Sequence, residues 1–138
     1  MRRVLLFVTL LVVGCRSPVT PQPDLQGVWT AHSSSRYLPD SSWIVRLTQA
    51  GRTLTGTGDY TGPAGRSGSL ALHGELNGPA EMPTGPLVGL SLVYANGQTW
   101  ALNAQLTDSL HLVGDLSMIS GPPPGGRDTI TFIRISPF

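Results

Sequence analysis

Apolar and polar residues alternate through most of the chain, and this pattern constrains the fold more than any other feature. In residues 69–76, for example, Leu70, Leu72 and Leu76 share one parity, while His73 has the other. A period of two is that of a β-strand with one buried face, whereas a helix would place its apolar residues three and four positions apart. No segment after the N-terminal region has a helical pattern. The predicted strands are residues 27–31, 43–49, 53–60, 69–76, 87–94, 100–106, 110–118 and 129–135.

About eight strands of this length, joined mostly by tight turns, are enough for a meander to close on itself. Closure removes the exposed edges at which sheets aggregate. Asn96-Gly97 predicts a hairpin with a type I′ turn, whose two central residues need positive φ. Inward-parity glycines such as Gly74 and Gly114 fit a closed sheet, since strand interiors tolerate glycine best at bends and close approaches. We therefore predict an all-β domain, an eight-stranded antiparallel up-and-down (meander) barrel.

The N-terminal segment has the composition of an export signal. Arg2 and Arg3 precede an unbroken apolar run from Val4 to Val13, which is the pattern of a cleaved secretion signal. The run is too short to span a membrane, because a spanning helix needs about 20 apolar residues. The sequence therefore predicts an exported protein.

Residues 12–15, Val-Val-Gly-Cys, resemble the bacterial lipobox, in which a small residue precedes a cysteine. The resemblance implies cleavage before Cys15 and attachment of acyl chains to it. Two or three chains anchor a protein firmly, since each buried methylene contributes about 0.8 kcal/mol. Arg16 stands where an aspartate is associated with inner-membrane retention, so we expect an outer-membrane lipoprotein, with the face of that membrane left open. The alternative is a lone buried cysteine after an ordinary signal peptide.

The predicted domain organisation is a lipoprotein signal peptide at 1–14, a lipidated cysteine with a proline-rich linker at 15–24, and a barrel domain at 25–138. The linker contains three prolines among polar residues, which is typical of an extended spacer. Two of the nine arginines lie in the signal segment, which leaves seven against eight acids. Without a basic stripe, nucleic acid is not an expected partner. With Cys15 acylated, no thiol remains for a disulfide or a thiolate metal site.

Gly27-Val28-Trp29 in the first strand and Arg134 in the last resemble the G-x-W and closing-arginine pair of the calycin superfamily, which includes lipocalins, fatty-acid-binding proteins and avidins. The resemblance implies that Gly27, Trp29 and Arg134 form a plug and cap at one end of the barrel. An indole supplies a large apolar plug, and a guanidinium can stack on its face. Gly58 stands where avidins have a ligand tyrosine, so biotin binding is not carried over.

The interior of an eight-stranded barrel is either filled by side chains or just wide enough for one small ligand. Parity does not separate these cases, because both need apolar residues that face inward. In the first case the protein is a solid envelope module whose loops, 32–42, 77–86 and 121–128, contact another protein. In the second it is a lipid-tethered carrier or sensor of a small apolar molecule. The residues predicted to line such a pocket are Tyr60, Leu72, Leu90, Tyr94, Trp100, Leu102 and Phe132.

No constellation of catalytic or metal-binding residues stands out. His73 and His111 have the outward parity of strands that are not neighbours in a meander, which favours exposed histidines over metal ligands. The serines of loop 32–42 have no base at a recognisable spacing. Asp59 and Glu75 are expected to lie across adjacent strands as solvated charges on the outer face. We therefore predict a non-enzymatic protein with no cofactor and no metal, and a hydrolase is the least favoured interpretation.

Replacing Cys15 by serine is expected to abolish incorporation of labelled palmitate, because serine lacks the thiol that carries the acylglyceryl group. Metabolic labelling of bacteria that express the full chain, followed by membrane fractionation, measures this. Ser17→Ala is the matched control and should label normally. Labelling that persists in Cys15→Ser, or that is missing from the unaltered chain, would contradict the lipobox interpretation.

Overall fold

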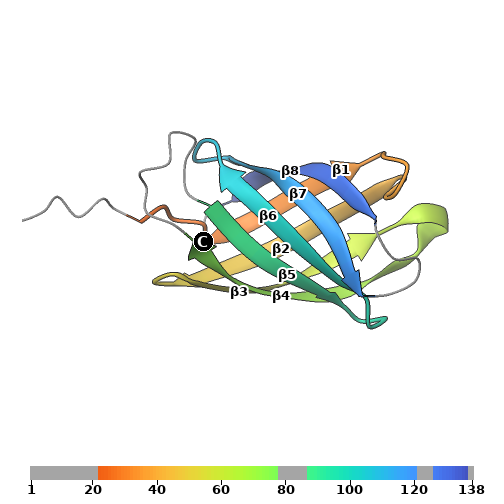
Figure 1. The fold of residues 1–138 in the computed structure, drawn as a ribbon, viewed down its shortest axis with the longest axis horizontal. Coiled ribbons are helices and arrows are strands. Elements are labelled where there is room, and N and C mark those ends of the chain that lie inside the picture. The colour runs from red at the N-terminus through yellow and green to blue at the C-terminus, as the bar shows by residue number, and fades with distance from the viewer. Residues whose placement is uncertain (1–21, 78–86, 121–125, 137–138) are drawn as a thin grey trace, which may run out of the picture.

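Eight antiparallel strands follow one another around a closed barrel (Figure 1). β1 (Gly27–Ser33) pairs with β2 (Ser41–Ala50) on one side and with β8 (Arg127–Ser136) on the other, so the sheet closes on itself. The computed structural model describes residues 22–77, 87–120 and 126–136. The other strands are β3 (Thr53–Thr61), β4 (Ser67–Asn77), β5 (Leu87–Tyr94), β6 (Thr99–Leu106) and β7 (His111–Ser120).

This arrangement confirms the predicted all-β class and the up-and-down barrel. Within the described segments the one helical element is a 3-10 turn, η1 (Pro63–Gly65), between β3 and β4. No helix in the part of the chain that the structure describes is both long and apolar enough to cross a bilayer. The predicted signal peptide, Cys15 and most of the linker lie outside the described residues, as do residues 78–86 and 121–125 of the two predicted loops.

Most strands are longer than the alternation predicts, because polar residues continue the pairing at their ends. β2 begins at Ser41, which pairs with Ser33 of β1, although the apolar pattern begins at Trp43. Backbone hydrogen bonds do not depend on apolar side chains, so serines extend a strand without extending its pattern. Sequence alternation therefore finds the centre of each strand better than its ends.

Two turns differ from the sequence prediction. β7 begins at His111 and not at Leu110, because Asp108 accepts a hydrogen bond from the Leu110 backbone N–H and holds that residue in the turn, half exposed. The hairpin at Asn96-Gly97 is present between β5 and β6. Gly97 has a φ of 85°, but no positive φ is found at Asn96, so the turn is not of type I′.

Inward-facing side chains from all eight strands form a single hydrophobic core. On β5 the predicted parity is confirmed, with Val88, Leu90, Leu92 and Tyr94 all buried. The outward positions of the same strand hold Gly89, serine and valine, which are more exposed. The core consists of these alternate positions, so the strand register decides which residues can reach the interior.

Glycine at position 74 lets β4 approach β5 closely. A Cβ atom placed there would lie 1.9 Å from the Gly89 carbonyl oxygen and 2.9 Å from the Leu90 Cα. Both of these are backbone atoms, so no side-chain rotation could relieve the overlap. The inward glycine is therefore required by the curvature of the sheet.

Gly74→Ala is expected to lower the free energy of unfolding by about 1–3 kcal/mol or more, because the methyl group must displace the backbone of β5. Urea denaturation followed by circular dichroism measures the change. Gly62→Ala is the matched control: it has an extended φ of −118°, and its nearest neighbour would be 3.8 Å from the new Cβ. We expect it to alter stability by no more than about 0.5 kcal/mol. Equal effects of the two substitutions would contradict this account of the barrel curvature.

Candidate functional site

The end of the barrel at which the chain enters is closed by Trp29. Its side chain is fully buried, and its indole N–H donates to the Leu25 carbonyl oxygen at 2.9 Å. Arg134 lies opposite Trp29 across the β1–β8 pair, and its guanidinium carbon is 5.7 Å from the ring centroid. Gly27, at the start of β1, has a φ of 147°, a conformation that favours glycine. The structure thus brings the three predicted plug and cap residues together at one end, the closed end.

Arg134 also fastens the entering chain to the last strand. Its guanidinium donates to the Asp24 carboxylate at 3.0 Å and to the Asp24 carbonyl oxygen at 3.2 Å, and it donates to the Gln26 carbonyl oxygen. Only 11% of the Arg134 side chain is exposed. The hydrogen bond from Arg134 holds the pKa of the Asp24 carboxyl below its usual value. The linker is predicted to run to Asp24, and in the structure that residue already contacts β8.

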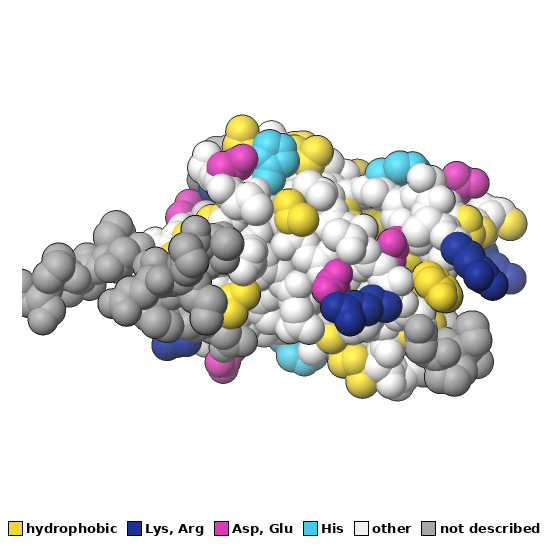
Figure 2. All heavy atoms as spheres, turned by 45° about the horizontal axis from the view of Figure 1, so that its top comes forward, with side chains coloured by type: hydrophobic (Ala, Val, Ile, Leu, Met, Phe, Trp, Pro, Cys, Tyr) yellow, Lys and Arg dark blue, Asp and Glu magenta, His cyan; other side chains and the backbone are white. Residues whose placement is uncertain are grey.

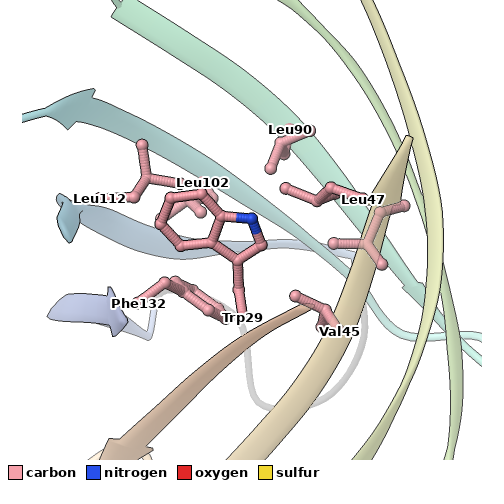
Figure 3. A pocket seen from close by; sticks show the side chains of 8 residues that line it. Trp29, Val45, Leu47, Leu90, Leu102, Leu112 and Phe132 are labelled. Atoms are coloured by element: carbon pink, nitrogen blue, oxygen red, sulfur yellow. The ribbon is translucent and has the colours of Figure 1, made fainter. Parts of the chain in front are cut away.

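The half of the barrel next to the plug is filled by side chains. Figure 3 shows the Trp29 ring surrounded by aliphatic residues and Phe132. The remaining void is about 10 Å³ and its lining is entirely apolar. That volume is close to the smallest that holds one water molecule, and a water there would find no hydrogen-bond partner. Four of the residues predicted to line a ligand pocket lie around this void: Leu72, Leu90, Leu102 and Phe132.

A larger cavity, of about 160 Å³, opens at the opposite end of the barrel, which we call the open end. It lies among the β1–β2, β3–β4 and β5–β6 connections, on the right of Figure 1. Three of the predicted lining residues, Tyr60, Tyr94 and Trp100, lie here rather than beside the void. Trp43 and Leu38 complete the apolar wall. The seven predicted residues are thus divided between a packed interior and an aromatic cleft.

The aromatic rings of the cleft are held in fixed positions by one another. The Trp43 indole N–H donates to the Tyr94 hydroxyl oxygen at 2.7 Å. The Tyr60 and Tyr94 rings meet edge to face, with centroids 4.6 Å apart and an interplanar angle of 76°. Trp100 packs against Gly126, where an added Cβ would lie 3.3 Å from the ring. Edge-to-face pairs are favourable and directional, so the cleft has a defined shape.

The hydroxyl group of Tyr94 supplies a hydrogen-bond donor to the cleft. An indole N–H can only donate, so Tyr94 is the acceptor in its bond with Trp43. That is the only hydrogen bond of the Tyr94 side chain among the described residues, and it leaves the hydroxyl proton uncommitted. The side chain is 6% exposed, and burial raises the pKa of Tyr94 to about 12. The group therefore stays protonated at any physiological pH.

Arg66 provides a positive charge at the rim of the cleft. It follows η1 and is exposed, and its backbone N–H donates to the Pro63 carbonyl oxygen at 3.3 Å. The ion pairs found in the described residues join other groups, so within those residues Arg66 has no carboxylate partner. The cleft therefore combines aromatic walls with the Tyr94 hydroxyl, the Arg66 cation and the polar residues Ser41, Asn96 and Gln98.

The structure places His73 and His111 on different strands and separates the two predicted acids. His73 is exposed on β4, as predicted. The His111 ring contacts the Asp108 carboxylate at 2.8 Å in the β6–β7 turn. Asp59 and Glu75 lie on adjacent strands, but Asp59 pairs with Ser69 and Glu75 with Thr53, so the acids are at opposite ends of the β3–β4 ladder. Across residues 22–77, 87–120 and 126–136, no group of three potential ligands could hold a metal ion.

One serine contacts an acid at the open end, yet it lacks the rest of a nucleophilic site. The Ser33 hydroxyl donates to the Asp128 carboxylate at 2.7 Å. A nucleophilic serine needs a base within hydrogen-bond reach that can accept its proton, with a third group that orients the base. No histidine lies between the two groups in this contact, and the hydrogen bond links β1 with β8 at an ordinary hydroxyl–carboxylate distance.

Sequence reasoning missed Trp43, Leu38 and Arg66 as cleft residues. Trp43 shares the inward parity of Val45 and Leu47, so alternation alone could have assigned it to the interior. Leu38 and Arg66 lie in connections that have no periodic pattern, and their positions follow from how those connections fold over the end of the barrel. No signal in the sequence identified them.

No protein-family model matches the chain, and no curated protein matches it at a significant level. The two ends of the barrel are therefore the features that distinguish a candidate site in this chain.

The raised pKa of Tyr94 predicts a loss of stability at high pH. Between pH 10 and 12 the unfolded chain releases the Tyr94 proton while the folded chain retains it, so the free energy of unfolding falls as pH rises. The slope contributed is at most about 1.4 kcal/mol per pH unit. Tyr94→Phe should remove this contribution. Urea denaturation of a chain that begins at Gln22, repeated from pH 9 to 12, measures it.

No lysine titrates in this pH range, because all nine Lys and Arg residues of the chain are arginine, which stays protonated. Tyr37→Phe, which alters an exposed ring, is the matched control and should keep the slope of the unaltered chain. A slope that is the same in Tyr94→Phe and in the unaltered chain would show that the Tyr94 hydroxyl is not buried in the folded state.

Proposed function

We propose that this protein is a non-enzymatic, lipid-anchored envelope protein that binds a small ring-shaped molecule in the cleft at the open end of its barrel. The observation that carries the proposal is the set of four rings around that cleft, Trp43, Tyr60, Tyr94 and Trp100. Concave, mainly apolar sites with a few convergent polar groups are the usual form of small-molecule sites. The cleft has this form.

The size of the cleft limits the ligand. Its volume of about 160 Å³ is close to the ~150 Å³ of an apolar cavity that binds benzene. Pockets for larger organic ligands are roughly 300–1,000 Å³. The interior void of about 10 Å³ adds no room below it. We therefore propose a single-ring group as the bound part of the ligand, and not an acyl chain threaded through the barrel.

The polar groups of the cleft indicate what the ring should carry. The Tyr94 hydroxyl can donate to an acceptor oxygen, and Arg66 can pair with a carboxylate or another anion. A carboxylate on the ligand would be the charged partner in both contacts. A hydrogen bond with one charged partner contributes about 1.5–3 kcal/mol. The proposed ligand is therefore an aromatic or similarly flat ring with an acidic substituent.

The lipid anchor places the cleft where solutes can reach it. The lipobox-like residues before Cys15 support acylation there. The chain joins the barrel at the closed end, where Asp24 binds Arg134. A tether attached at that end leaves the cleft at the end away from the bilayer. The proposed arrangement is a binding protein whose site faces the surrounding aqueous compartment.

Benzoate and benzyl alcohol test the proposal, because they share a ring and differ in charge. We expect a chain that begins at Gln22 to bind benzoate, as measured by calorimetry, and Trp100→Ala to weaken both probes by about two- to tenfold, the equivalent of the ~0.5–1.5 kcal/mol of an aromatic contact. Arg66→Gln should weaken benzoate severalfold and leave benzyl alcohol unchanged. Arg36→Gln removes an exposed arginine that does not line the cleft and should change neither.

Native mass spectrometry of the same chain extends the test to molecules retained from the cell. Binding that is undetectable for both probes, together with the absence of any retained small molecule, would contradict the proposed function. Binding that is insensitive to Trp100→Ala would place the site elsewhere on the barrel.

A second candidate function is docking of another envelope protein on the open end. Tyr37 and Ile119 flank this end with 56% and 62% of their surface exposed, respectively. Exposed aromatic and aliphatic residues around a pocket are typical of a surface that accepts a side chain from a partner. Crosslinking from a photoreactive group at position 37 distinguishes the two candidates. An adduct with another protein favours docking. Benzoate binding without any protein adduct favours the small molecule.

A further inference from the structure

We infer that three exposed hydrophobic residues at the closed end, Leu110, Ile133 and Ile135, rest on the lipid bilayer and orient the barrel with its cleft pointing away from the membrane. We call these residues the lipid-facing patch. The inference depends on the proposed acylation of Cys15, and it adds a second, non-covalent contact with the same membrane.

The three side chains surround the point at which the chain joins the barrel. Ile133 and Ile135 flank Arg134, which binds Asp24 of the entering segment. The backbone N–H of Arg134 donates to the Leu110 carbonyl oxygen at 2.8 Å, which places the β6–β7 turn beside the same residue. Figure 2 shows hydrophobic side chains on this face both near this end and near the opposite end, interspersed with polar and charged ones. The patch and the tether therefore share one location.

Exposure of these residues has no explanation within the barrel. Leu110, Ile133 and Ile135 are 50%, 44% and 58% exposed, although β8 has threonine at other outward positions such as Thr129 and Thr131. They account for three of the seven large hydrophobic residues that are exposed in the described part of the chain. A grouping of apolar side chains on one surface is typical of an interaction site.

The length of the tether identifies the bilayer as the occupant. Six residues lie between Cys15 and Gln22, the first residue that the structure describes, and the seven Cα–Cα steps span at most about 25 Å. An acylated Cys15 therefore keeps the closed end within this distance of the lipid. A patch too small to bind a membrane from solution can do so when it is tethered, because the tether makes the second contact intramolecular.

The charges around the patch indicate an apolar contact rather than attraction to anionic lipid. His111 pairs with Asp108 at 2.8 Å, and Arg134 pairs with Asp24. The Arg52 guanidinium, in the β2–β3 turn at the same end, donates to the Leu76 carbonyl oxygen at 2.9 Å. These three basic groups are thus matched by acids or bound to the backbone. Two further exposed charges near this end, Arg46 and Glu75, have no ion-pair partner in the described residues and are opposite in sign. The contact should depend little on salt or on the fraction of anionic lipid.

The test uses the full acylated chain reconstituted in phosphatidylcholine vesicles. Because acylation occupies Cys15, a new cysteine can be labelled selectively with a polarity-sensitive dye. Ser109→Cys places the dye in the turn beside Leu110, and Ser34→Cys places it in an exposed loop at the open end. With a quencher carried on the lipid, we expect severalfold stronger quenching at position 109 than at 34, at both low and high salt.

Removal of the patch should then abolish the difference. Ile133→Thr with Ile135→Thr is expected to reduce quenching at 109 severalfold, whereas the matched pair Val93→Thr with Ile119→Thr, which removes exposed apolar residues near the open end, should leave it unchanged. Circular dichroism checks that every variant keeps its sheet, and flotation with vesicles checks the anchor.

Equal quenching at 109 and 34 in protein that floats with vesicles would overturn the inference while leaving the anchor intact. Protein that fails to float and carries no palmitate would instead overturn the proposed anchoring, and the inference with it. A dye shift that occurs only at high protein-to-lipid ratio, without quenching from the lipid, would assign the patch to a second copy of the chain. Benzoate binding is measured separately and is unaffected by any of these outcomes.

Discussion

The pairing of β1 with β8 is the contact on which the rest of the structure depends. It joins segments from opposite ends of the domain and turns an open meander into a barrel with paired strands throughout. Trp29 and Arg134 lie on the two strands of this pair, so the plug and its cap exist only once the barrel has closed. The Arg134 guanidinium then binds Asp24 and Gln26, which adds the entering chain to the same junction. The closure of the barrel, the burial of Trp29 and the contact with the entering chain therefore depend on one another.

Packing then decides which part of the barrel can take a ligand. Large side chains from several strands meet around Trp29, and they leave a void that a single water would nearly fill. Toward the other end the residues change from aliphatic to aromatic, and their rings contact one another edge to face or through a hydrogen bond. The cleft is the space that these rings leave at the open end of the barrel. The same barrel thus has a solid half and a hollow end.

Much of this fold could be predicted from the sequence, because a period of two reports directly on which residues face inward. Val88, Leu90 and Leu92 are buried as the alternation requires. The ends of the strands could not be predicted, since residues such as Ser41 pair through the backbone and carry no apolar signal. The division of the inward residues between void and cleft could not be predicted either. Alternation shows whether a residue faces the interior but not how far along the barrel axis it lies. Arg66 is in a connection, where no alternation is present.

The distribution of chemistry between the two ends is consistent with the proposed attachment to a membrane. At the closed end, Arg134 is paired with Asp24 and the His111 ring contacts Asp108, and isoleucines remain exposed beside them. At the open end, Arg66 and the Tyr94 hydroxyl have no partner for their charge or proton among the described residues. Satisfied polar groups beside exposed apolar ones suit a surface next to lipid, where an unpaired charge would be costly. Unsatisfied polar groups around aromatic rings suit a site that meets solutes, because the ligand completes their hydrogen bonds. The entering chain joins the closed end. The same strand order therefore places the proposed tether at one end of the barrel and the cleft at the other.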